Sequence, residues 1–269
     1  MKGFSFAIKS GWNDMNFKIV AHTDVGIKKS TNQDSVLMKI AQTDYGNVSF
    51  SAICDGMGGL AKGELASATL IRMLSKWFEE EFPTLLYRGL SLEILQKSWT
   101  DLIYQANSKI SSYGQALHTS MGTTVVVLLI VGQVYYIGNV GDSRVYRIRE
   151  ELQQLTKDQT VVQREMDLGR LTYEEACRDP RRNVLLQCVG ASQVIEPDFF
   201  TGNVEPGTMF LLCSDGFRHV IAADELYQYL TPYKVFHEEA MRESLVYLTE
   251  LNKYRQETDN ISAALVRVD

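Results

Sequence analysis

The sequence has little of what marks small disulfide-rich proteins or nucleic-acid-binding proteins. Only 4 of its 269 residues are cysteine, and no two form a Cys-x-x-Cys pair. Cys54, Cys188 and Cys213 lie inside apolar runs, which favours buried, reduced thiols over disulfides. The formal net charge is -6, so the chain lacks the positive excess with which proteins bind nucleic acid through bulk charge. We therefore expect no nucleic-acid partner.

Long hydrophobic runs are also missing. The most apolar stretch, residues 123–131, is too short to span a bilayer and ends at a Gly-Gln pair. Near the N-terminus, the run Phe4–Ile8 is interrupted by Lys9 before it reaches the length of a signal peptide. We expect a cytoplasmic protein with no membrane partner. No Pro- or Ser-rich stretch or charge block divides the chain, so residues 1–269 are predicted to form a single domain, and we expect a monomer.

Six segments are rich in β-branched and aromatic residues and are bounded by Gly, Asn or Asp, a pattern typical of strands. They are residues 48–54, 124–131, 134–140, 144–149, 208–213 and 261–268. Gly132-Gln133 fits a two-residue hairpin turn. A turn at Gly141-Asp142-Ser143 is expected to reverse the chain again and to give an antiparallel meander.

Apolar residues at steps of three and four predict two consecutive amphipathic helices over roughly residues 63–112, each able to cover one sheet. Another helix is predicted across residues 238–253. Together with the strands, these helices favour an α+β domain in which antiparallel sheets pack together with helices outside.

Residues 157–183, called the excursion below, are polar and charged, and Thr172 and Glu175 are spaced as a helix-capping box. The excursion is expected on the surface. Both a tolerated loop insertion and a functional element remain open, since long excursions in compact domains are often functional.

Four acids share one relation to the predicted strands. Asp55, Asp142 and Asp215 each follow a strand-like run, and Asp259 precedes one. Carboxylates gathered at one end of a core repel one another and lose hydration, so they need compensating charge. A cluster of oxygen ligands suits hard cations such as Mg²⁺ or Mn²⁺. The pattern favours a metal-dependent hydrolase.

The string from Asp55 to Ser67, DGMGGLAKGELAS, resembles the signature of the bacterial metal-dependent Ser/Thr protein phosphatases of the 2C type, the PPM family. Further segments resemble the family's other motifs in the same order along the chain. They are TDVG with KSTNQD (23–34), MGTT (121–124), GNVGDSR (138–144), LTKD (155–158), CSDG (213–216) and TDN (258–260). The resemblance implies a four-layer αββα fold, an antiparallel β-sandwich flanked by helices, with a flap subdomain at about residues 157–183.

The same resemblance implies the metal ligands. Asp55 would bridge two Mn²⁺ or Mg²⁺ ions, Asp215 and Asp259 would complete the first site, and the Gly56 carbonyl would contribute to the second. Asp142, together with Asp215, would correspond to a third metal site. Two cations about 4 Å apart lower the pKa of a bridging water and neutralise charge during in-line attack on phosphorus. Hydroxide between the ions would be the nucleophile, with no phosphoenzyme.

Two other positions are implied to act on water and phosphate. Asp34 would hold a metal-bound water. Lys29 stands where the family usually has the Arg that holds substrate phosphate, and Lys is a point charge without a bidentate fork, so phosphate binding is expected to be weaker. As alternatives, Lys28 or a residue of the excursion supplies the cation, or Lys28 and Lys29 are solvated turn lysines.

Met57 stands where the eukaryotic relatives carry His, so no general acid is available there, and modest turnover on protein substrates is expected. The alternative is that Met57 serves only in packing. The histidines show no ligand spacing, and none is assigned a role.

The leading hypothesis is a phosphatase for phosphoserine and phosphothreonine in proteins, opposing a bacterial Ser/Thr kinase. Two alternatives stay open. One is a weak or inactive regulator that binds phosphoproteins, which the Lys29 departure motivates. The other is hydrolysis of a small phosphate ester, which an open, charged surface disfavours because small-ligand sites are usually enclosed.

Overall fold

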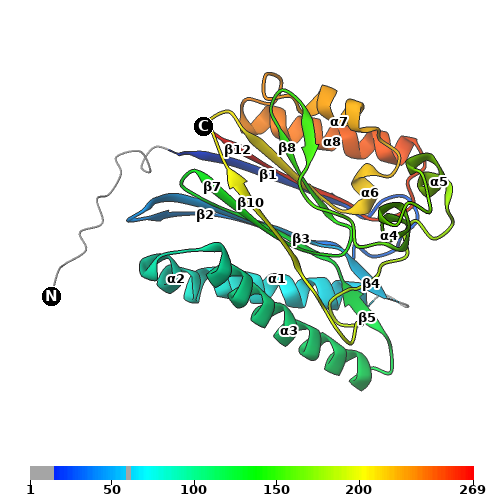
Figure 1. The fold of residues 1–269 in the computed structure, drawn as a ribbon. Helices are drawn as coiled ribbons and strands as arrows, with labels where there is room; N and C mark the ends of the chain where they lie inside the picture. The colour runs from blue at the N-terminus through cyan, green and yellow to red at the C-terminus, as the bar shows by residue number, and fades with distance from the viewer. Residues whose placement is uncertain (1–14, 59–61) are drawn as a thin grey trace.

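The computed structural model describes residues 15–58 and 62–269. The apolar run Phe4–Ile8 and residues 59–61 of the glycine-rich string lie outside the described residues. Two antiparallel sheets pack face to face, and helices cover both outer faces (Figure 1). The predicted four-layer α+β fold is confirmed.

Each of the two sheets of the sandwich has five strands. The first sheet has the order β1 (Phe17–Asp24), β12 (Ile261–Val268), β11 (Met209–Cys213), β8 (Arg144–Ile148) and β9 (Leu152–Gln154). The second has the order β10 (Asp198–Asn203), β7 (Val134–Val140), β6 (Val125–Val131), β3 (Gly46–Cys54) and β2 (Ser35–Thr43). A small separate pair joins β4 (Gly56–Gly58) to β5 (Met121–Thr123). Side chains from both sheets, including Ile53, Phe210 and Val266, fill the core between them.

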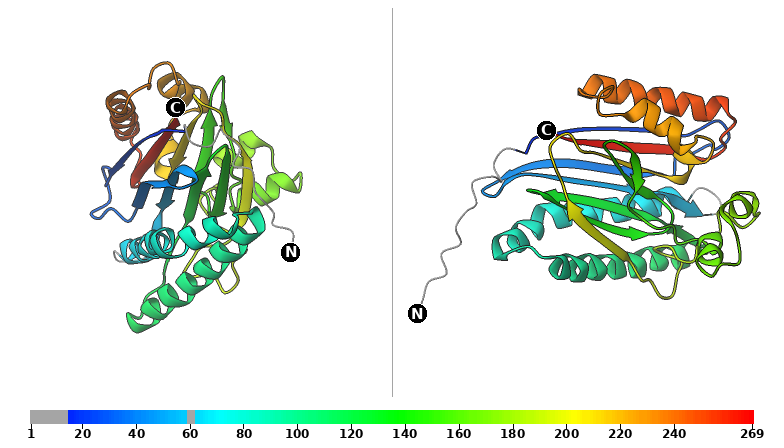
Figure 2. Two further views of the ribbon diagram at one scale, coloured as in Figure 1. Left: turned by 90° about the vertical axis from the view of Figure 1, so that its left-hand side faces the viewer. Right: turned by 45° about the horizontal axis from the view of Figure 1, so that its top comes forward.

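The helices segregate by sheet, as the two views in Figure 2 show. The second sheet is covered by α1 (Gly63–Glu80), α2 (Phe82–Arg88) and α3 (Leu92–Ala116). The first sheet is covered by α7 (Ala223–Leu230) and α8 (Glu238–Tyr254). The two helices predicted between residues 63 and 112 therefore cover the same sheet. Both α1 and α3 turn apolar faces, with Trp77 and Trp99 buried, toward the same sheet.

A third helix separates these two. Pro83 lies in the first turn of α2, where its missing N–H breaks no helical hydrogen bond. The sequence prediction missed α2 because it is only seven residues long. Among the described residues, no helix is both long enough and apolar enough to cross a membrane.

The turn at Gly141-Asp142-Ser143 behaves differently from the prediction. β6 and β7 form the expected hairpin, with Val131 opposite Val134. β7 and β8, however, do not pair, because β8 belongs to the other sheet and lies beside β11. The chain therefore crosses between the sheets at Asp142 instead of continuing a meander. Gly141 has φ +107°, a conformation that favours glycine.

The excursion contains two short helices, α4 (Val161–Asp167) and α5 (Tyr173–Arg178). The predicted capping box is present: Thr172 Oγ1 accepts from the Glu175 N–H, and Glu175 accepts from the Thr172 N–H. Both helices lie at one end of the sandwich (Figure 1).

Candidate active site

The strand registers bring the acids of the sequence pattern to one end of the sandwich. In the second sheet, Cys54 at the end of β3 is opposite Ser35 at the start of β2, which places Asp55 beside Asp34. In the first sheet, Cys213 at the end of β11 is opposite Ala263 near the start of β12. Asp215 follows β11 and Asp259 precedes β12, so both acids lie at the same end of these two paired strands. The crossing between the sheets adds Asp142 at the same end.

Main-chain hydrogen bonds fix the position of Asp55. Its N–H donates to Thr124 Oγ1 at 3.0 Å, and its carbonyl accepts from the Thr124 N–H at 2.8 Å and from Thr123 Oγ1 at 3.0 Å. Gly56 follows at the start of β4, where an added Cβ would lie 2.3 Å from the Gly63 carbonyl oxygen. Only glycine fits there, so helix α1 can begin directly against the Asp55 turn.

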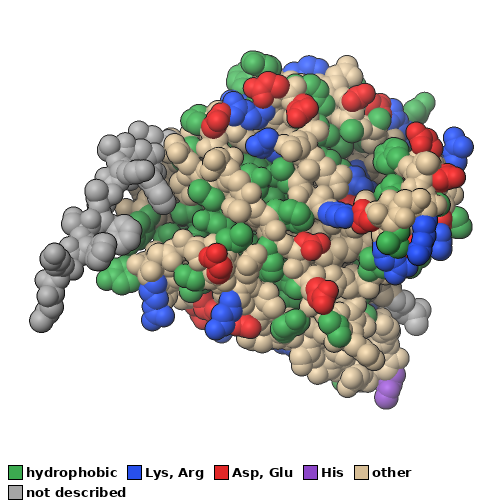
Figure 3. Space-filling view, viewed as in Figure 1, with side chains coloured by type: hydrophobic (Ala, Val, Ile, Leu, Met, Phe, Trp, Pro, Cys, Tyr) green, Lys and Arg blue, Asp and Glu red, His purple; other side chains and the backbone are tan. Residues whose placement is uncertain are grey.

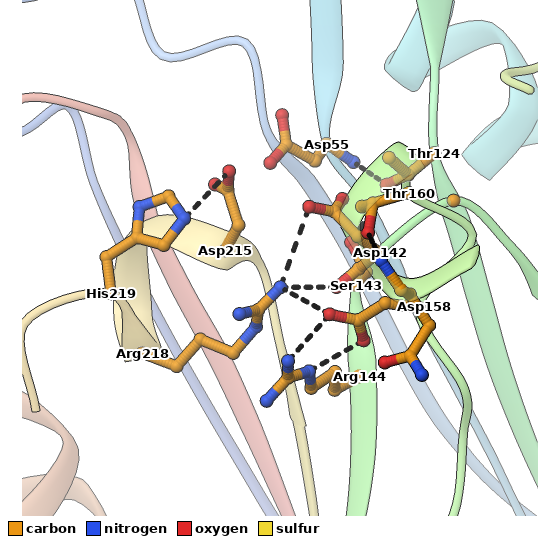
Figure 4. Close-up of polar contacts among 12 residues, drawn as sticks. Asp55, Thr124, Asp142, Ser143, Arg144, Asp158, Thr160, Asp215, Arg218 and His219 are labelled. Carbon is orange, nitrogen blue, oxygen red and sulfur yellow. Dashed lines mark hydrogen bonds and ion pairs between the residues drawn. The ribbon is translucent and has the colours of Figure 1, made fainter. Parts of the chain in front are cut away.

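The carboxyl groups lie in a strongly unfavourable environment for negative charge. Burial, together with repulsion from Asp215 and Asp259, raises the pKa of Asp34 to about 7. Burial and repulsion from Asp34, Asp215 and other acids raise the pKa of Asp55 well above its usual range. The carboxylates of Asp55, Asp142 and Asp215 turn toward the same space (Figure 4).

A histidine and a further acid flank Asp215. His219 Nε2 lies 3.3 Å from Asp215 Oδ2, and its Nδ1 lies 3.4 Å from Glu257 Oε2. Glu257 Oε1 accepts from the N–H groups of Thr258 and Asp259. Burial opposes charge on His219, but Glu257 and Asp215 outweigh it and raise its pKa. His219 therefore links the two chain segments that carry Asp215 and Asp259.

Lys29 lies at the exposed side of the acids. Its Nζ is 2.7 Å from Asp259 Oδ1, and its side chain is 40% exposed. Partial burial would lower the pKa of Lys29, but the contact with Asp259 and the fields of Asp55 and Asp215 raise it. Lys28 is exposed and, within residues 15–58 and 62–269, makes no ion pair.

Two arginines and two acids form a separate group beside the cluster (Figure 4). Arg144 binds Asp158 through two hydrogen bonds, Nε to Oδ1 at 2.7 Å and Nη2 to Oδ2 at 2.6 Å. Arg218 Nη2 lies 3.4 Å from the same Asp158 carboxylate and 3.6 Å from Asp142 Oδ2, and it donates to the Asp142 carbonyl at 2.9 Å.

A groove of about 1130 Å³ runs from the acids to the excursion. Its lining includes Asp142, Asp259 and Arg218 together with Tyr173 and Arg182 of the excursion. Its size suits an extended chain segment better than a single small molecule.

The chemistry of the acids fits divalent cations. Among the described residues, both carboxylate oxygens of Asp34 and Oδ1 of Asp215 are buried without a hydrogen bond, and neither Asp34 nor Asp55 forms an ion pair. Carboxylate oxygens are the ligands that Mg²⁺ and Mn²⁺ prefer. In the part of the chain that the structure describes, no three His, Cys, Asp or Glu side chains are close enough to share one ion. The fit to divalent cations therefore rests on the chemistry of the carboxylate oxygens and on the directions in which they point. It does not rest on a complete set of ligands around one position.

The structure brings the acids of the sequence pattern to one end of the sandwich, and their roles stay predictions. The sequence prediction gave no role to three neighbours of these acids: Arg218, His219 and Glu257. A signal was available for two of them. Helix α6 (Asp215–Arg218) begins at Asp215, and helical spacing puts residues three and four positions later on the same side. The approach of Glu257 depends on tertiary packing and leaves no mark in the sequence.

The chain is similar to known proteins over nearly its whole length. The family model for Protein phosphatase 2C matches residues 25–263. The serine/threonine phosphatase stp of Listeria monocytogenes serotype 4b (strain F2365) is 34% identical over 221 residues, 81% of this chain and 83% of the relative. The solved serine/threonine phosphatase of S. agalactiae superimposes with a TM-score of 0.81 at 30% identity, covering 94% of this chain and all of that one.

A further solved structure carries metal. It is the catalytic domain of the serine/threonine protein phosphatase PstP in complex with two manganese ions, with a TM-score of 0.76, 30% identity, and coverage of 94% of this chain and 99% of that chain. Family match, sequence identity and fold agree with the cluster of acids at the strand ends. The chain accordingly belongs to the protein phosphatase 2C family and is a bacterial, metal-dependent Ser/Thr protein phosphatase of the PPM type.

Proposed function

We propose that this enzyme removes phosphate from phosphoserine and phosphothreonine of proteins with two Mn²⁺ or Mg²⁺ ions held by Asp55, Asp215, Asp259 and the Gly56 carbonyl. The observation that carries the proposal is the convergence of buried strand-end carboxylates, of which Asp34 and Asp55 have no ion-pair partner among the described residues. When bound, such ions lower the pKa of coordinated water and neutralise the phosphoryl charge during in-line displacement.

Asp34 orients the attacking water in this proposal. Its carboxylate is buried beside Asp55 and makes no hydrogen bond of ordinary geometry among the described residues, although the nearby Ser262 and Ser214 hydroxyls partly offset the rise in its pKa. A water entering the cluster meets an acceptor there. Without bound ions, burial and the neighbouring acids raise the pKa of Asp34 to about 7. Bound cations would lower that pKa, so Asp34 acts as an ionised acceptor that orients the water.

Lys29 contacts the substrate phosphate in this proposal. Its ammonium lies at the exposed edge of the acids and is held by Asp259 alone among the described residues. The flexible Lys29 side chain can exchange its contact with Asp259 for a contact with a substrate phosphate. It cannot make the two parallel hydrogen bonds that an arginine makes.

A protein substrate is supported by the surface around the groove. Lys and Arg side chains gather over α4 and α5 (Figure 3), and Arg182, which lines the groove, forms no ion pair with any described residue. A groove with a free cation suits a phosphorylated segment. Because phosphoserine and phosphothreonine arise from kinases, we propose that a bacterial Ser/Thr kinase supplies the substrates.

The test is phosphate release from a phosphothreonine peptide with Mn²⁺, with and without chelator, in the parent enzyme and in Asp215→Asn. We expect metal-dependent release that the substitution lowers by about 10³-fold, since one metal interaction supplies several kcal/mol of transition-state stabilisation. A well-folded parent that releases no phosphate but binds the peptide would instead favour the regulator hypothesis. Faster release from nucleotides than from peptides would favour a small-ester hydrolase.

His219→Ala is expected to weaken Mn²⁺ binding by about 10- to 100-fold, as losses of side chains that orient metal ligands commonly do. The reason is that His219 holds Asp215 and reaches the Asp259 segment through Glu257. The measurement is the Mn²⁺ concentration for half-maximal activity, together with direct Mn²⁺ binding. His118→Ala, at an exposed position beyond α3, is the matched control. Equal Mn²⁺ affinities in the two variants would contradict the role of His219.

A further inference from the structure

Two arginines lie beside two acids at the edge of the acid cluster. Asp142 and Asp158 contribute two negative charges, and Arg144 and Arg218 contribute two positive charges within contact distance. Of the remaining acids, Asp259 pairs with Lys29 and Asp215 with His219, whereas Asp34 and Asp55 have no ion-pair partner among the described residues. Asp142 therefore has a guanidinium beside it, which Asp34 and Asp55 lack among the described residues.

The Arg218 guanidinium is also held firmly in place. Its side chain is 11% exposed, and one nitrogen, Nη2, has the Asp142 carbonyl, the Asp142 carboxylate and the Asp158 carboxylate as neighbours. The short helix α6 that carries it is anchored by Asn252, whose side chain donates to the Phe217 carbonyl at 2.9 Å. These contacts all fall on Nη2, and Nε has no hydrogen-bond partner among the described residues. The hydrogen bond to the Asp142 carbonyl and the low exposure of the side chain keep the guanidinium beside Asp142.

We propose that Arg218 is a built-in cation which takes the place of a third metal ion at Asp142, so that Asp142 is not a metal ligand in this enzyme. The inference rests on the proposed two-ion site and deepens it. A divalent ion at Asp142 would lie beside a fixed positive charge, and repulsion between cations in a partly buried site is strong because the surroundings screen it poorly.

Arg218 is a positioning residue in this arrangement. It joins the crossing between the sheets at Asp142 to Asp158 at the start of the excursion, and Arg144 shares Asp158 from β8. The charge that sets the orientation of Asp142 is thus supplied by the chain and does not depend on the metal concentration around the enzyme.

The test counts bound Mn²⁺ by equilibrium dialysis followed by elemental analysis of the protein. We expect two ions in the parent and still two in Asp142→Asn, because Asp142 holds none. Arg218→Ala should bind a third ion, and the double variant Arg218→Ala/Asp142→Asn should return to two. Arg218→Lys, which keeps the positive charge, should remain at two. Thermal unfolding of each variant checks that it is folded.

Loss of one ion in Asp142→Asn alone would overturn the inference, and this comparison stands even where Arg218→Ala fails to fold. A folded Arg218→Ala protein that binds only two ions would overturn it as well, because removal of the guanidinium would then open no site. A parent that binds no Mn²⁺ at all would remove the proposed metal centre itself. That result differs from a parent that binds three ions and loses one in Asp142→Asn, which would leave the proposed function intact.

Discussion

Asp55→Asn is expected to lower Mn²⁺-dependent phosphate release by about 10³-fold or more and, in the presence of chelator, to raise the melting temperature by a few degrees. The activity falls because the proposed bridging carboxylate becomes a weak neutral ligand. The stability rises because Asp55 is repelled by Asp34, Asp215, Asp142 and Asp259, and an amide of the same shape removes that repulsion. A gain of 1 kcal/mol corresponds to about 2–4 °C in a protein of this size.

The pH dependence of stability gives this prediction a second, independent measurement. The folded-state pKa values of Asp34 and Asp142, about 7, lie above the ordinary value of 3.8. The native state therefore binds more protons than the unfolded state between about pH 4 and 7, and the stability of the chelator-treated protein must fall as pH rises through that window. Asp55→Asn should make this fall shallower, because Asp55, whose own pKa is raised in the folded protein, no longer takes up a proton on folding.

Melting curves between pH 5 and 8 in chelator check both effects. Asp101→Asn, on the exposed side of α3, is the matched control and should change neither the activity nor the melting temperature. A lower melting temperature in Asp55→Asn at pH 8 would show that the acids are not in electrostatic conflict, and the metal centre would lose its main physical argument.

The sequence predicted the interior strands and missed the edge strands. The six predicted segments correspond to β3, β6, β7, β8, β11 and β12, which are the six strands with neighbours on both sides. In the two large sheets the missed strands, β1, β2, β9 and β10, are the edges, and the separate pair β4 and β5 was missed as well. Interior strands such as β6 are buried on both faces and form continuous apolar runs. Edge strands such as β2 carry half-buried and exposed residues, and edges commonly keep polar side chains.

In the candidate site, too, the sequence predicts the local features and misses those that depend on tertiary packing. Strand ends followed by acids are local features, so the convergence of Asp55, Asp215 and Asp259 was predictable. The crossing at Asp142 was not, because a Gly-Asp-Ser turn is equally compatible with a hairpin and with a passage to another sheet. The partner of β8 is β11, more than 60 residues later, and only the packed core selects it. The contacts of Arg218 with Asp142 and Asp158 follow from that crossing.

Gly216→Ala is expected to lower activity by about 10²-fold with a stability loss of about 1–3 kcal/mol. Gly216 follows Asp215 in α6, and a Cβ there would lie 2.2 Å from the Asn260 carbonyl oxygen and 3.3 Å from Asp259 Cβ. The methyl group must push the two acid-bearing segments apart, and a shift of about 1 Å in a catalytic arrangement costs about this much rate. Overpacking accounts for the loss of stability.

Gly207→Ala separates this steric effect from the general cost of replacing glycine. An added Cβ at Gly207 meets nothing within 4 Å, but φ is +82°, so backbone strain alone should cost about 1–2 kcal/mol. The turn at Gly207 precedes β11, whereas Asp215 follows it, so the turn lies at the opposite end of the strand from the acids. We expect two variants of similar stability, of which only Gly216→Ala loses activity and Mn²⁺ affinity. Full activity in Gly216→Ala would mean that Asp215 and Asp259 do not need to be pressed together, because the methyl group cannot be accommodated without separating them.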